Sequence, residues 1–435
     1  MTEGRLNTIR QKYPFVVEVL LRARRSNWLR AGGILLFANA IVVVFGIIRT
    51  PLLTWVLPKD EVGMIGVLAA WFPFVQLLSL SGLDSAAYHY AAKGQSGAFR
   101  VNLRYRLRWS LLTACSFFLG AIFWFSKGDV LLTWMFIIAG LSFPFTAGLS
   151  ACAGLLSAEQ RFKSLFWYRI FESLTDFTGF IPLIFSFWAI SKVVSFYTAN
   201  QFATAIMMVG VSLVLIRQSN QSNTQTLTPE DEAELVRYGK HLTGISAISV
   251  LHTRTDALLI GLFLPLGTMA DYSIALLISE QFKRLWIIYV TLRYTPLVRM
   301  PLQQRRRRFV QEGTLLWVSF VVIGIMIALL GHWLIPILLP AAYTSSLGFM
   351  DILIAAFVVG LPGNITELFY RSCQDEKSQY LMRLFAAVIG VSAPIILLLR
   401  LGGIGVALGR MAASLVLSII GIYLFVRGNY KSQIS

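Results

Sequence analysis

The chain has 435 residues, of which 56% are hydrophobic and only 14% are charged, and its mean hydropathy is +0.68. A soluble globular domain is typically about 25% charged, so this composition excludes an ordinary soluble fold. The formal net charge of +17 would suit a nucleic-acid-binding protein. Basic residues also collect in the cytoplasmic loops of membrane proteins, so their position along the chain has to decide.

Residues 1–30 form a basic leader without the small-residue cleavage site that follows the short apolar core of a secretory signal. We therefore expect this leader to stay attached. Its segment Pro14–Arg25 combines apolar and basic residues in a way that suits an interfacial helix on an anionic membrane surface. A solvated basic tail explains the same residues equally well.

Apolar stretches follow almost without interruption, each close to the roughly 20 residues that cross a bilayer with all backbone groups satisfied. We predict twelve spans, at 32–54, 63–84, 109–126, 130–153, 172–190, 193–216, 241–264, 270–292, 313–337, 349–370, 380–399 and 404–426. The predicted fold class is therefore an all-α, polytopic membrane protein. Proline and glycine inside spans predict kinks at Pro144, Pro182, Pro362 and Gly363.

The charge distribution predicts the topology. If the N-terminus lies inside, most of the 38 Lys and Arg fall in inner segments, so both termini are predicted to be cytoplasmic. The run Arg305–Arg308 lies between spans 8 and 9, where we interpret it as a topology anchor in contact with lipid headgroups, not a nucleic-acid site.

An internal repeat divides the chain into two halves. Residues 30–58 align without a gap to residues 237–265, and LLSAEQRFKS at 155–164 resembles YRSCQDEKSQ at 370–379. Six spans start and end on the same side, so the two copies should have one orientation and be related by an axis along the membrane normal. We predict a leader at 1–30, six-helix lobes at 31–216 and 237–428, a polar cytoplasmic linker at 217–236 and a tail at 429–435, with a substrate cavity between the lobes.

Ionisable residues inside the spans are the candidate functional residues, because a charge at the bilayer centre costs at least about 2.5–3.5 kcal/mol and usually faces an aqueous cavity. Cations of a substrate pathway are predicted at Arg254, Lys283, Arg284, Arg410 and Arg49. Carboxylates for ion coupling or ion pairing are predicted at Asp256, Glu280, Asp176, Glu172 and Asp84. Glu280 stands three and four residues before Lys283 and Arg284, within pairing distance of either on a helix. A structural ion pair that locks the helices is the alternative, and snorkelling explains Arg49, Asp84, Asp351 and Arg371.

Other chemistry has little support in the sequence. Cys115, Cys152 and Cys373 show no metal-ligand spacing, so we expect neither a disulfide framework nor a metal site. The four histidines form no recognisable catalytic pair and the outer loops are short, so we do not expect an enzyme. No cofactor is predicted beyond a coupling ion, H⁺ or Na⁺, that a buried carboxylate could bind.

The segment RAGGILLFANAIVVVFGIIRTPLLTWVLPKDEVGMIGVLAAWFPFVQLLSLSGLDSAAYHYAAK at 30–93, together with LLSAEQRFKS, resembles Wzx-type oligosaccharide flippases of the MATE-like MOP superfamily. The resemblance implies two lobes that rock around a charged cavity and carry an undecaprenyl-pyrophosphate-linked oligosaccharide across the bacterial inner membrane. It also implies contact with membrane lipids and, as candidate partners, other proteins of polysaccharide assembly, but no nucleic acid. Guanidinium groups suit the two phosphates of such a lipid.

Two alternatives remain open. A MATE-type antiporter of organic cations would share the fold, although it would favour carboxylates and aromatic residues without cations among them. A non-transporting membrane subunit or an enzyme of polysaccharide assembly would act on the same lipid-linked sugars.

Overall fold

A computed structural model describes residues 27–427 except 93, 94, 96, 160, 186–189, 222–226, 299, 300 and 374. The leader up to residue 26, with its proposed interfacial helix, and the predicted tail at 429–435 lie outside the described residues. Throughout the described part the secondary structure is helical, which confirms the all-α fold class.

The first half of the chain contains helices that are often broken into two pieces. They are α3 (Asn27–Val56), α4 (Lys59–Leu78), α5 (Gly82–Ala92), α6 (Ala98–Ser126), α7 (Val130–Thr146), α8 (Cys152–Ala158), α9 (Phe162–Thr178), α10 (Phe180–Ile184) and α11 (Lys192–Gln221). The predicted kink at Pro144 falls two residues before α7 ends, and Pro182 lies in the short α10.

The second half has longer, continuous helices. They are α12 (Pro229–Phe263), α13 (Leu266–Val298), α14 (Leu302–Leu338), the short η1 (Ala341–Tyr343), α15 (Ser346–Ser372) and α16 (Glu376–Arg427). Pro362 and Gly363 lie inside α15 without ending it. At Gly402 the backbone of α16 takes φ 60° and ψ −138°, a conformation that glycine adopts easily, and this splits α16 into two successive spans.

The chain crosses the bundle twelve times, as predicted: along α3, α4 with α5, α6, α7 with α8, α9 with α10, α11, α12, α13, α14, α15 and the two parts of α16. Seven of the described helices are long and apolar enough to span a membrane by length and composition alone. Helix α13 is not among them because its charged residues lower its hydropathy.

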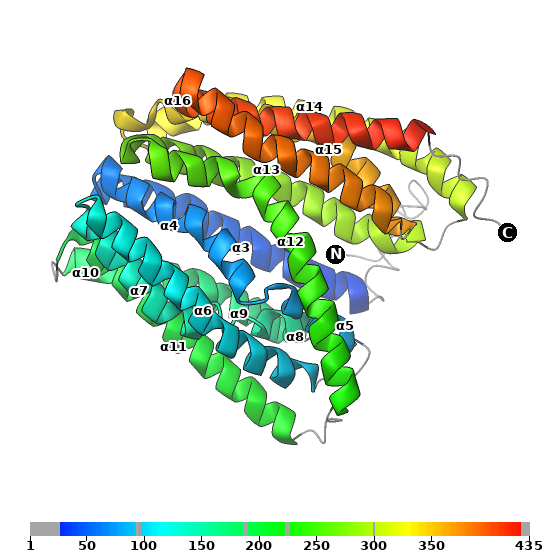
Figure 1. The fold of residues 1–435 in the computed structure, drawn as a ribbon, viewed down its shortest axis with the longest axis horizontal. Coiled ribbons are helices and arrows are strands. Elements are labelled where there is room, and N and C mark those ends of the chain that lie inside the picture. Colours follow the sequence, from blue (N-terminus) through cyan, green and yellow to red (C-terminus); the bar gives the residue numbers. More distant parts are fainter. Residues whose placement is uncertain are drawn as a thin grey trace, which may run out of the picture.

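We name the two ends of the bundle by their turns. The hairpin end carries the turns between α3 and α4 and between α12 and α13, and the linker end carries the end of α11 and the start of α12 (Figure 1). Part of the predicted linker 217–236 is helical, because α12 begins at Pro229 with Thr228 as its N-cap, whose hydroxyl accepts a hydrogen bond from the Asp231 amide.

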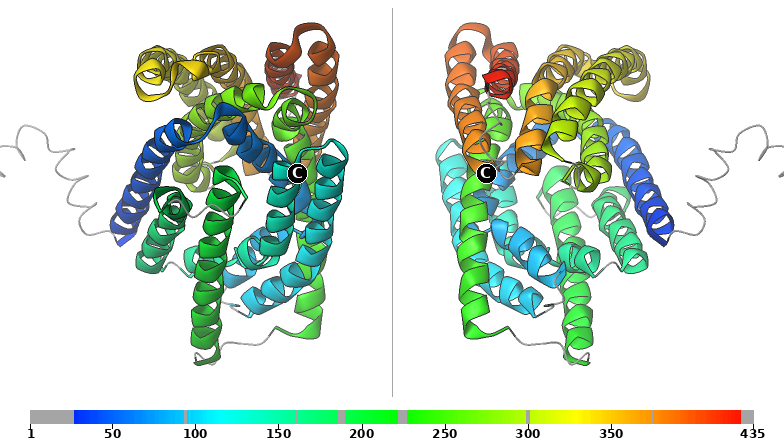
Figure 2. Two further views of the ribbon diagram at one scale, coloured as in Figure 1. Left: turned by 90° about the vertical axis from the view of Figure 1, so that its left-hand side faces the viewer. Right: turned by 90° about the vertical axis from the view of Figure 1, so that its right-hand side faces the viewer.

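The two halves lie side by side, with α13–α16 on one side of the bundle and α6–α11 on the other (Figures 1 and 2). Near the linker end the first turns of α12 pack on α5, where Leu83 and Leu235 are fully buried. Near the hairpin end α4 packs on α13 so closely that a Cβ on Gly63 would lie 2.0 Å from the Leu266 carbonyl oxygen.

A lysine joins the halves at the hairpin end. The ammonium of Lys59, at the start of α4, donates to Asp271 on α13 at 2.8 Å and to the Ala342 carbonyl oxygen at 2.6 Å. It also lies 5.5 Å from the centre of the Tyr343 ring. We call these contacts of Lys59 the hairpin-end latch.

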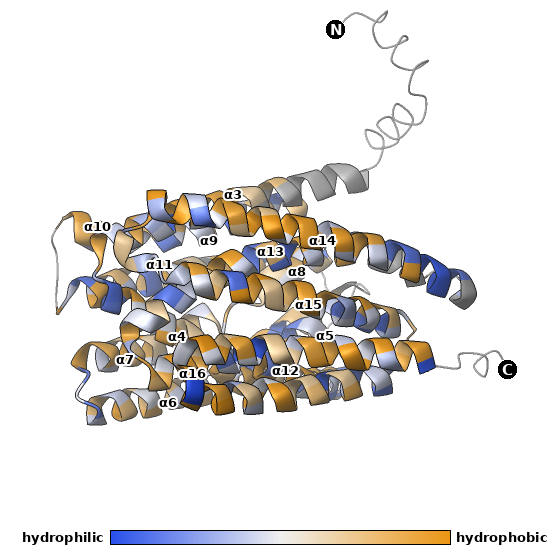
Figure 3. Cartoon of the chain, turned by 90° about the horizontal axis from the view of Figure 1, so that it is seen from above, coloured by the Kyte–Doolittle hydropathy of each residue, from blue (hydrophilic) through white to orange (hydrophobic). Residues whose placement is uncertain are grey.

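The helices are largely hydrophobic along their length, and hydrophilic residues concentrate at their ends and at a few points in between (Figure 3). Large apolar side chains such as Leu119, Trp333 and Leu399 are mostly exposed. A surface of this kind is stable against lipid, because hydrocarbon does not penalise exposed apolar groups.

Candidate functional site

Five of the predicted charged residues meet at one point in the middle of the second half. Arg254 and Asp256 come from α12, Glu280 and Lys283 from α13, and Arg410 from the second part of α16. We call these five residues the charge cluster. The sequence places them on three separate helices, and the packing of α12 against α16 and of α13 beside α12 brings them together.

The innermost pair of the cluster is tightly held. Arg410 donates to Asp256 Oδ2 at 2.7 Å, and the Tyr272 hydroxyl donates to the same oxygen. The Asp256 side chain is only 3% exposed and that of Arg410 14%. A charged pair so far from water is stable only when it is well hydrogen-bonded, and here the tyrosine supplies an additional donor.

Glu280 lies at the centre of the outer part of the cluster and holds its cations loosely. Its Oε1 lies 3.4 Å from Arg254, 3.9 Å from Lys283 and 4.0 Å from Arg410. Only the first of these distances is near the hydrogen-bonding range. One carboxylate therefore serves three cations, and their N–H groups keep donor capacity for another anion.

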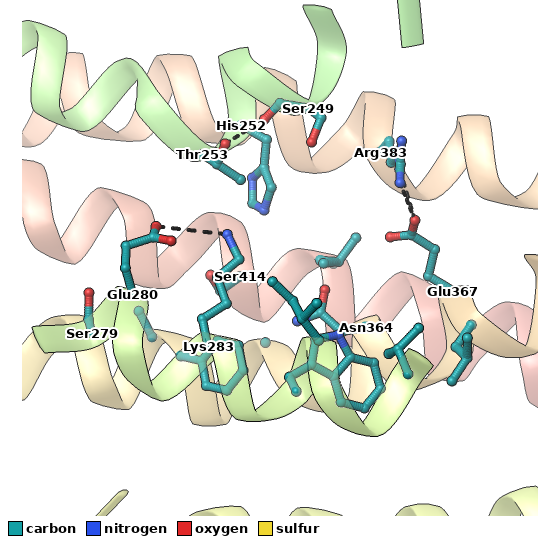
Figure 4. Close-up of a pocket in the computed structure, with 18 of the residues that line it drawn as sticks. Ser249, His252, Thr253, Ser279, Glu280, Lys283, Asn364, Glu367, Arg383 and Ser414 are labelled. Atoms are coloured by element: carbon teal, nitrogen blue, oxygen red, sulfur yellow. Dashed lines mark hydrogen bonds and ion pairs between the residues drawn. The ribbon is translucent and has the colours of Figure 1, made fainter. Parts of the chain in front are cut away.

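A cavity of about 700 Å³ opens beside this cluster. Glu280, Lys283 and Arg410 line it at one end, and small side chains along its walls, including Ser249 and Ser414, leave the space unfilled. Figure 4 shows Glu280 and Lys283 paired on one side of the cavity and Glu367 paired with Arg383 on the other.

The position of this cavity differs from the expected one between the lobes. The described residues that line it come from α12, α13, α15 and α16, all in the second half, and, in the first half, from α5 at Tyr88. Small residues let α15 and α16 pack closely along one wall of this cavity, because a Cβ on Gly360 would lie 3.0 Å from the Ser414 Cβ.

The remaining predicted residues lie elsewhere. Arg284 is exposed on α13, and among the described residues it has no ion-pair partner. Arg49 on α3 pairs with Asp176 on α9 at 3.6 Å, and Glu172 pairs with Arg169 at 2.8 Å. These pairs belong to the first half and are separate from the charge cluster.

Asp84 accepts hydrogen bonds from Asn102 at 2.9 Å and from Arg106, both on α6. Asp351 pairs with His332 at 2.9 Å. Asp84, Asp351 and Arg49 thus have partners in the protein, and Arg371 lines the cavity. Snorkelling alone does not describe these four residues.

Some residues of these sites were absent from the sequence prediction. Arg106 was assigned to an inner loop, yet α6 begins at Ala98 and Arg106 is fully buried. The pair Glu367–Arg383 and the amide of Asn364 were also missed, since a lone polar residue near a span end resembles ordinary loop sequence. The spacing of Asn102 and Arg106, four residues apart on one helix face, is the signal that could have identified the buried arginine.

Within the part of the chain that the structure describes, no group of three or more His, Cys, Asp and Glu side chains is close enough to hold a metal ion. The charge cluster combines guanidinium and ammonium donors with carboxylate acceptors, and donors of this kind form strong hydrogen bonds with anionic groups.

Comparison with known proteins agrees with this architecture. A sequence model of the family described as "Polysaccharide biosynthesis protein" matches residues 28–293. No curated protein matches the chain.

Solved structures resemble the fold over most of its length. An inward-facing multidrug resistance MATE family transporter of the MOP superfamily has a TM-score of 0.68 at 14% identity, covering 88% of this chain and 94% of that one. The lipid II flippase MurJ in an inward closed conformation has a TM-score of 0.66 at 13% identity, covering 89% and 86%. An outward-facing MATE transporter follows with a TM-score of 0.61 at 12% identity, covering 92% and 94%. These likenesses confirm the MATE-like fold.

Proposed function

Because the chain belongs to the family of polysaccharide biosynthesis proteins, we propose that it is a flippase for a lipid-pyrophosphate-linked oligosaccharide in the bacterial inner membrane. The observation that carries this proposal is the charge cluster, which concentrates cations beside a cavity midway along spanning helices. An anionic headgroup crossing hydrocarbon needs such groups, since its charge is otherwise strongly disfavoured there.

The balance of charge in the cluster favours an anionic cargo. Three cations face two carboxylates, and Asp256 is committed to Arg410. Arg254 and Lys283 share Glu280 at distances longer than a good hydrogen bond. A pyrophosphate offers several strong acceptors, so these two cations can donate to the phosphates, while Glu280 keeps its contact with Arg410.

Arg284 extends the proposed pathway beyond the cavity. It follows Lys283 directly, is exposed, and forms no ion pair among the described residues. We propose that it attracts the pyrophosphate before the headgroup reaches the charge cluster.

The predicted carboxylates act in this proposal through their ion pairs. Each of Asp256, Glu280, Asp176, Glu172 and Asp84 contacts a cationic side chain. A coupling proton or sodium ion would therefore have to displace that cation. Glu280 is the carboxylate best suited to such an exchange, because its three contacts are all long.

Orientation follows from the basic residues. Arg104, Arg161 and Arg305 lie near the linker end of the bundle, and cytoplasmic loops carry such an excess of positive charge. We propose that the linker end is cytoplasmic, that both termini lie on that side, and that the cargo moves from the linker end to the hairpin end by alternating access.

The test is a flipping assay with the purified chain in liposomes, using lipid-linked oligosaccharide extracted from membranes of cells that lack this protein. Arg254→Met, Lys283→Met and Arg284→Met should each lower the rate at least about tenfold, since each removes a charge-assisted contact of about 1.5–3 kcal/mol. The matched control is Arg400→Met, an exposed arginine near the Gly402 turn, which should leave the rate unchanged.

Two results would contradict the proposal. Wild-type rates in all three pathway variants, at equal protein content, would exclude a role for these cations. A chain that expels cationic dyes and moves no lipid-linked oligosaccharide would instead be an antiporter of organic cations.

A further inference from the structure

The cavity beside the charge cluster is far longer than a pyrophosphate. On α15 its lining runs from Leu353 to Arg371, which corresponds to roughly 27 Å of helix. The charge cluster occupies only the end near Leu353. The remaining length runs toward the linker end and has a different chemistry.

Asn364 offers an unused amide in this second part of the cavity. It lines the wall and is partly exposed there (Figure 4), and its side chain has no hydrogen-bond partner among the described residues. An amide supplies two N–H donors and an acceptor oxygen. At a depth where lipid surrounds the helices, such a group is stable only with water or a polar ligand beside it.

The pair Glu367–Arg383 supplies further planar polar groups. Arg383 donates from Nε at 3.0 Å and from a terminal nitrogen to the same oxygen, Glu367 Oε1. The second carboxylate oxygen, Oε2, therefore keeps its acceptor capacity while the arginine fixes the side chain in place.

Aromatic rings line this part of the cavity at Trp286 and its border with the charge cluster at Phe357. Trp286 lines it and stacks on Tyr289 with ring centres 5.6 Å apart, and Phe357 lines it and packs on Phe282 at 5.0 Å. Rings held by neighbouring rings present a rigid apolar face. An apolar face beside amide and carboxylate groups matches a pyranose, which has C–H groups on its faces and hydroxyls on its rim.

We propose that this part of the cavity, formed by Trp286, Phe357, Asn364, Glu367 and Arg383, is a sugar subsite that holds the residues of the glycan next to the pyrophosphate. The inference rests on the proposed function and goes beyond it, because it assigns glycan recognition to α13, α15 and α16. A polyprenyl tail would leave the Asn364 amide and the Glu367 Oε2 atom without hydrogen-bond partners. A free anion would not need the aromatic walls.

The test compares two ligands on the full-length purified protein. One is the lipid-linked oligosaccharide extracted from membranes of cells that lack this protein, and the other is undecaprenyl pyrophosphate without sugars. Asn364→Leu keeps the branching and the number of heavy atoms of the side chain and removes its hydrogen-bonding groups. Gln201→Leu, a polar-to-apolar change on α11 in the other half, is the matched control, and thermal unfolding of each variant reports its folding.

Wild-type protein should bind the oligosaccharide lipid more tightly than the bare lipid. Asn364→Leu should weaken binding of the oligosaccharide lipid about tenfold and leave binding of the bare lipid unchanged, and Gln201→Leu should change neither. Three results for Asn364→Leu would each overturn the sugar subsite: equal losses of affinity for both ligands, no loss for either, or tighter binding of the bare lipid. None of these results would contradict the proposed flippase function. Failure of the wild type to bind either ligand would overturn the proposed function as well.

Discussion

Removal of the Lys59 ammonium should open the hairpin end. This side chain, at the start of α4, reaches both α13 and η1 in the hairpin-end latch, through Asp271 and the Ala342 carbonyl. Lys59→Met keeps a similar length and apolar stem but loses the charge. Asp271, whose side chain is 6% exposed, would then remain buried without its partner in the closed state.

The size of the effect follows from these contacts. A hydrogen bond to a charged group contributes about 1.5–3 kcal/mol, and a buried ion pair that loses one partner costs about 3–5 kcal/mol. The Lys59 side chain is 25% exposed, so water compensates part of the loss. We expect a net shift of about 2 kcal/mol away from the closed state, which changes the equilibrium between closed and open hairpin ends about 30-fold.

Spin labels at Ser126 and Ser345 would measure this shift, since both residues are exposed at the hairpin end and belong to different halves. After replacement of the native cysteines, the distance distribution of Lys59→Met should gain a longer component that the unaltered latch lacks. The double variant Lys59→Asp/Asp271→Lys should reduce this component. If the distributions of Lys59→Met and the parent coincide, the latch does not hold the hairpin end closed.

Two further predictions concern buried ion pairs. Arg410→Met should lower the free energy of unfolding by about 3–5 kcal/mol, because it leaves Asp256 buried and charged. Adding Asp256→Asn should restore most of this loss, as measured by thermal unfolding. Equal unfolding temperatures of the single and double variants would contradict this prediction. Arg106→Met should destabilise the folded protein by about 2–3 kcal/mol, because Asp84 then keeps only its hydrogen bond from the Asn102 amide. The flipping rate per folded molecule should not change. A rate that falls while the unfolding temperature stays the same would place Arg106 in the transport pathway instead.

The fold could be predicted from hydropathy and from the internal repeat, because few backbone structures are stable in the hydrocarbon of a bilayer. Every backbone group must be satisfied within the segment, so an apolar stretch of about 20 residues is almost obliged to be a helix. The span boundaries on either side of Pro58 and Gly402 were predictable for the same reason. The breaks between α4 and α5 or between α7 and α8 were not, since they depend on packing and leave hydropathy unchanged.

The sequence located the members of the charge cluster but not their pairing. Glu280 and Lys283 are close along one helix, so that pair was predictable. The partnership of Asp256 with Arg410, 154 residues later, depends on how α12 packs against α16. Arg106 was missed because an arginine at the edge of an apolar stretch lowers local hydropathy whether it faces water or protein.

One helix links the latch to the cargo site. Asp271 of the latch and Lys283 of the charge cluster both lie on α13, twelve residues apart, or roughly 18 Å along the axis. The intervening turns pack on α4, where Gly66 lies against Ser273 and leaves no room for a side chain. At the repeat positions of Glu280, Lys283 and Arg284 the first half has Pro73, Gln76 and Leu77, so α4 lacks the charges that α13 carries. A cargo that draws Lys283 away from Glu280 therefore acts on the same rigid element that closes the hairpin end. Because α13 is an uninterrupted helix over this distance, a small rotation at the charge cluster moves Asp271 relative to Lys59. Cargo binding and opening of the hairpin end are thus coupled through α13 in this proposal, and the coupling needs no second charged site in the first half.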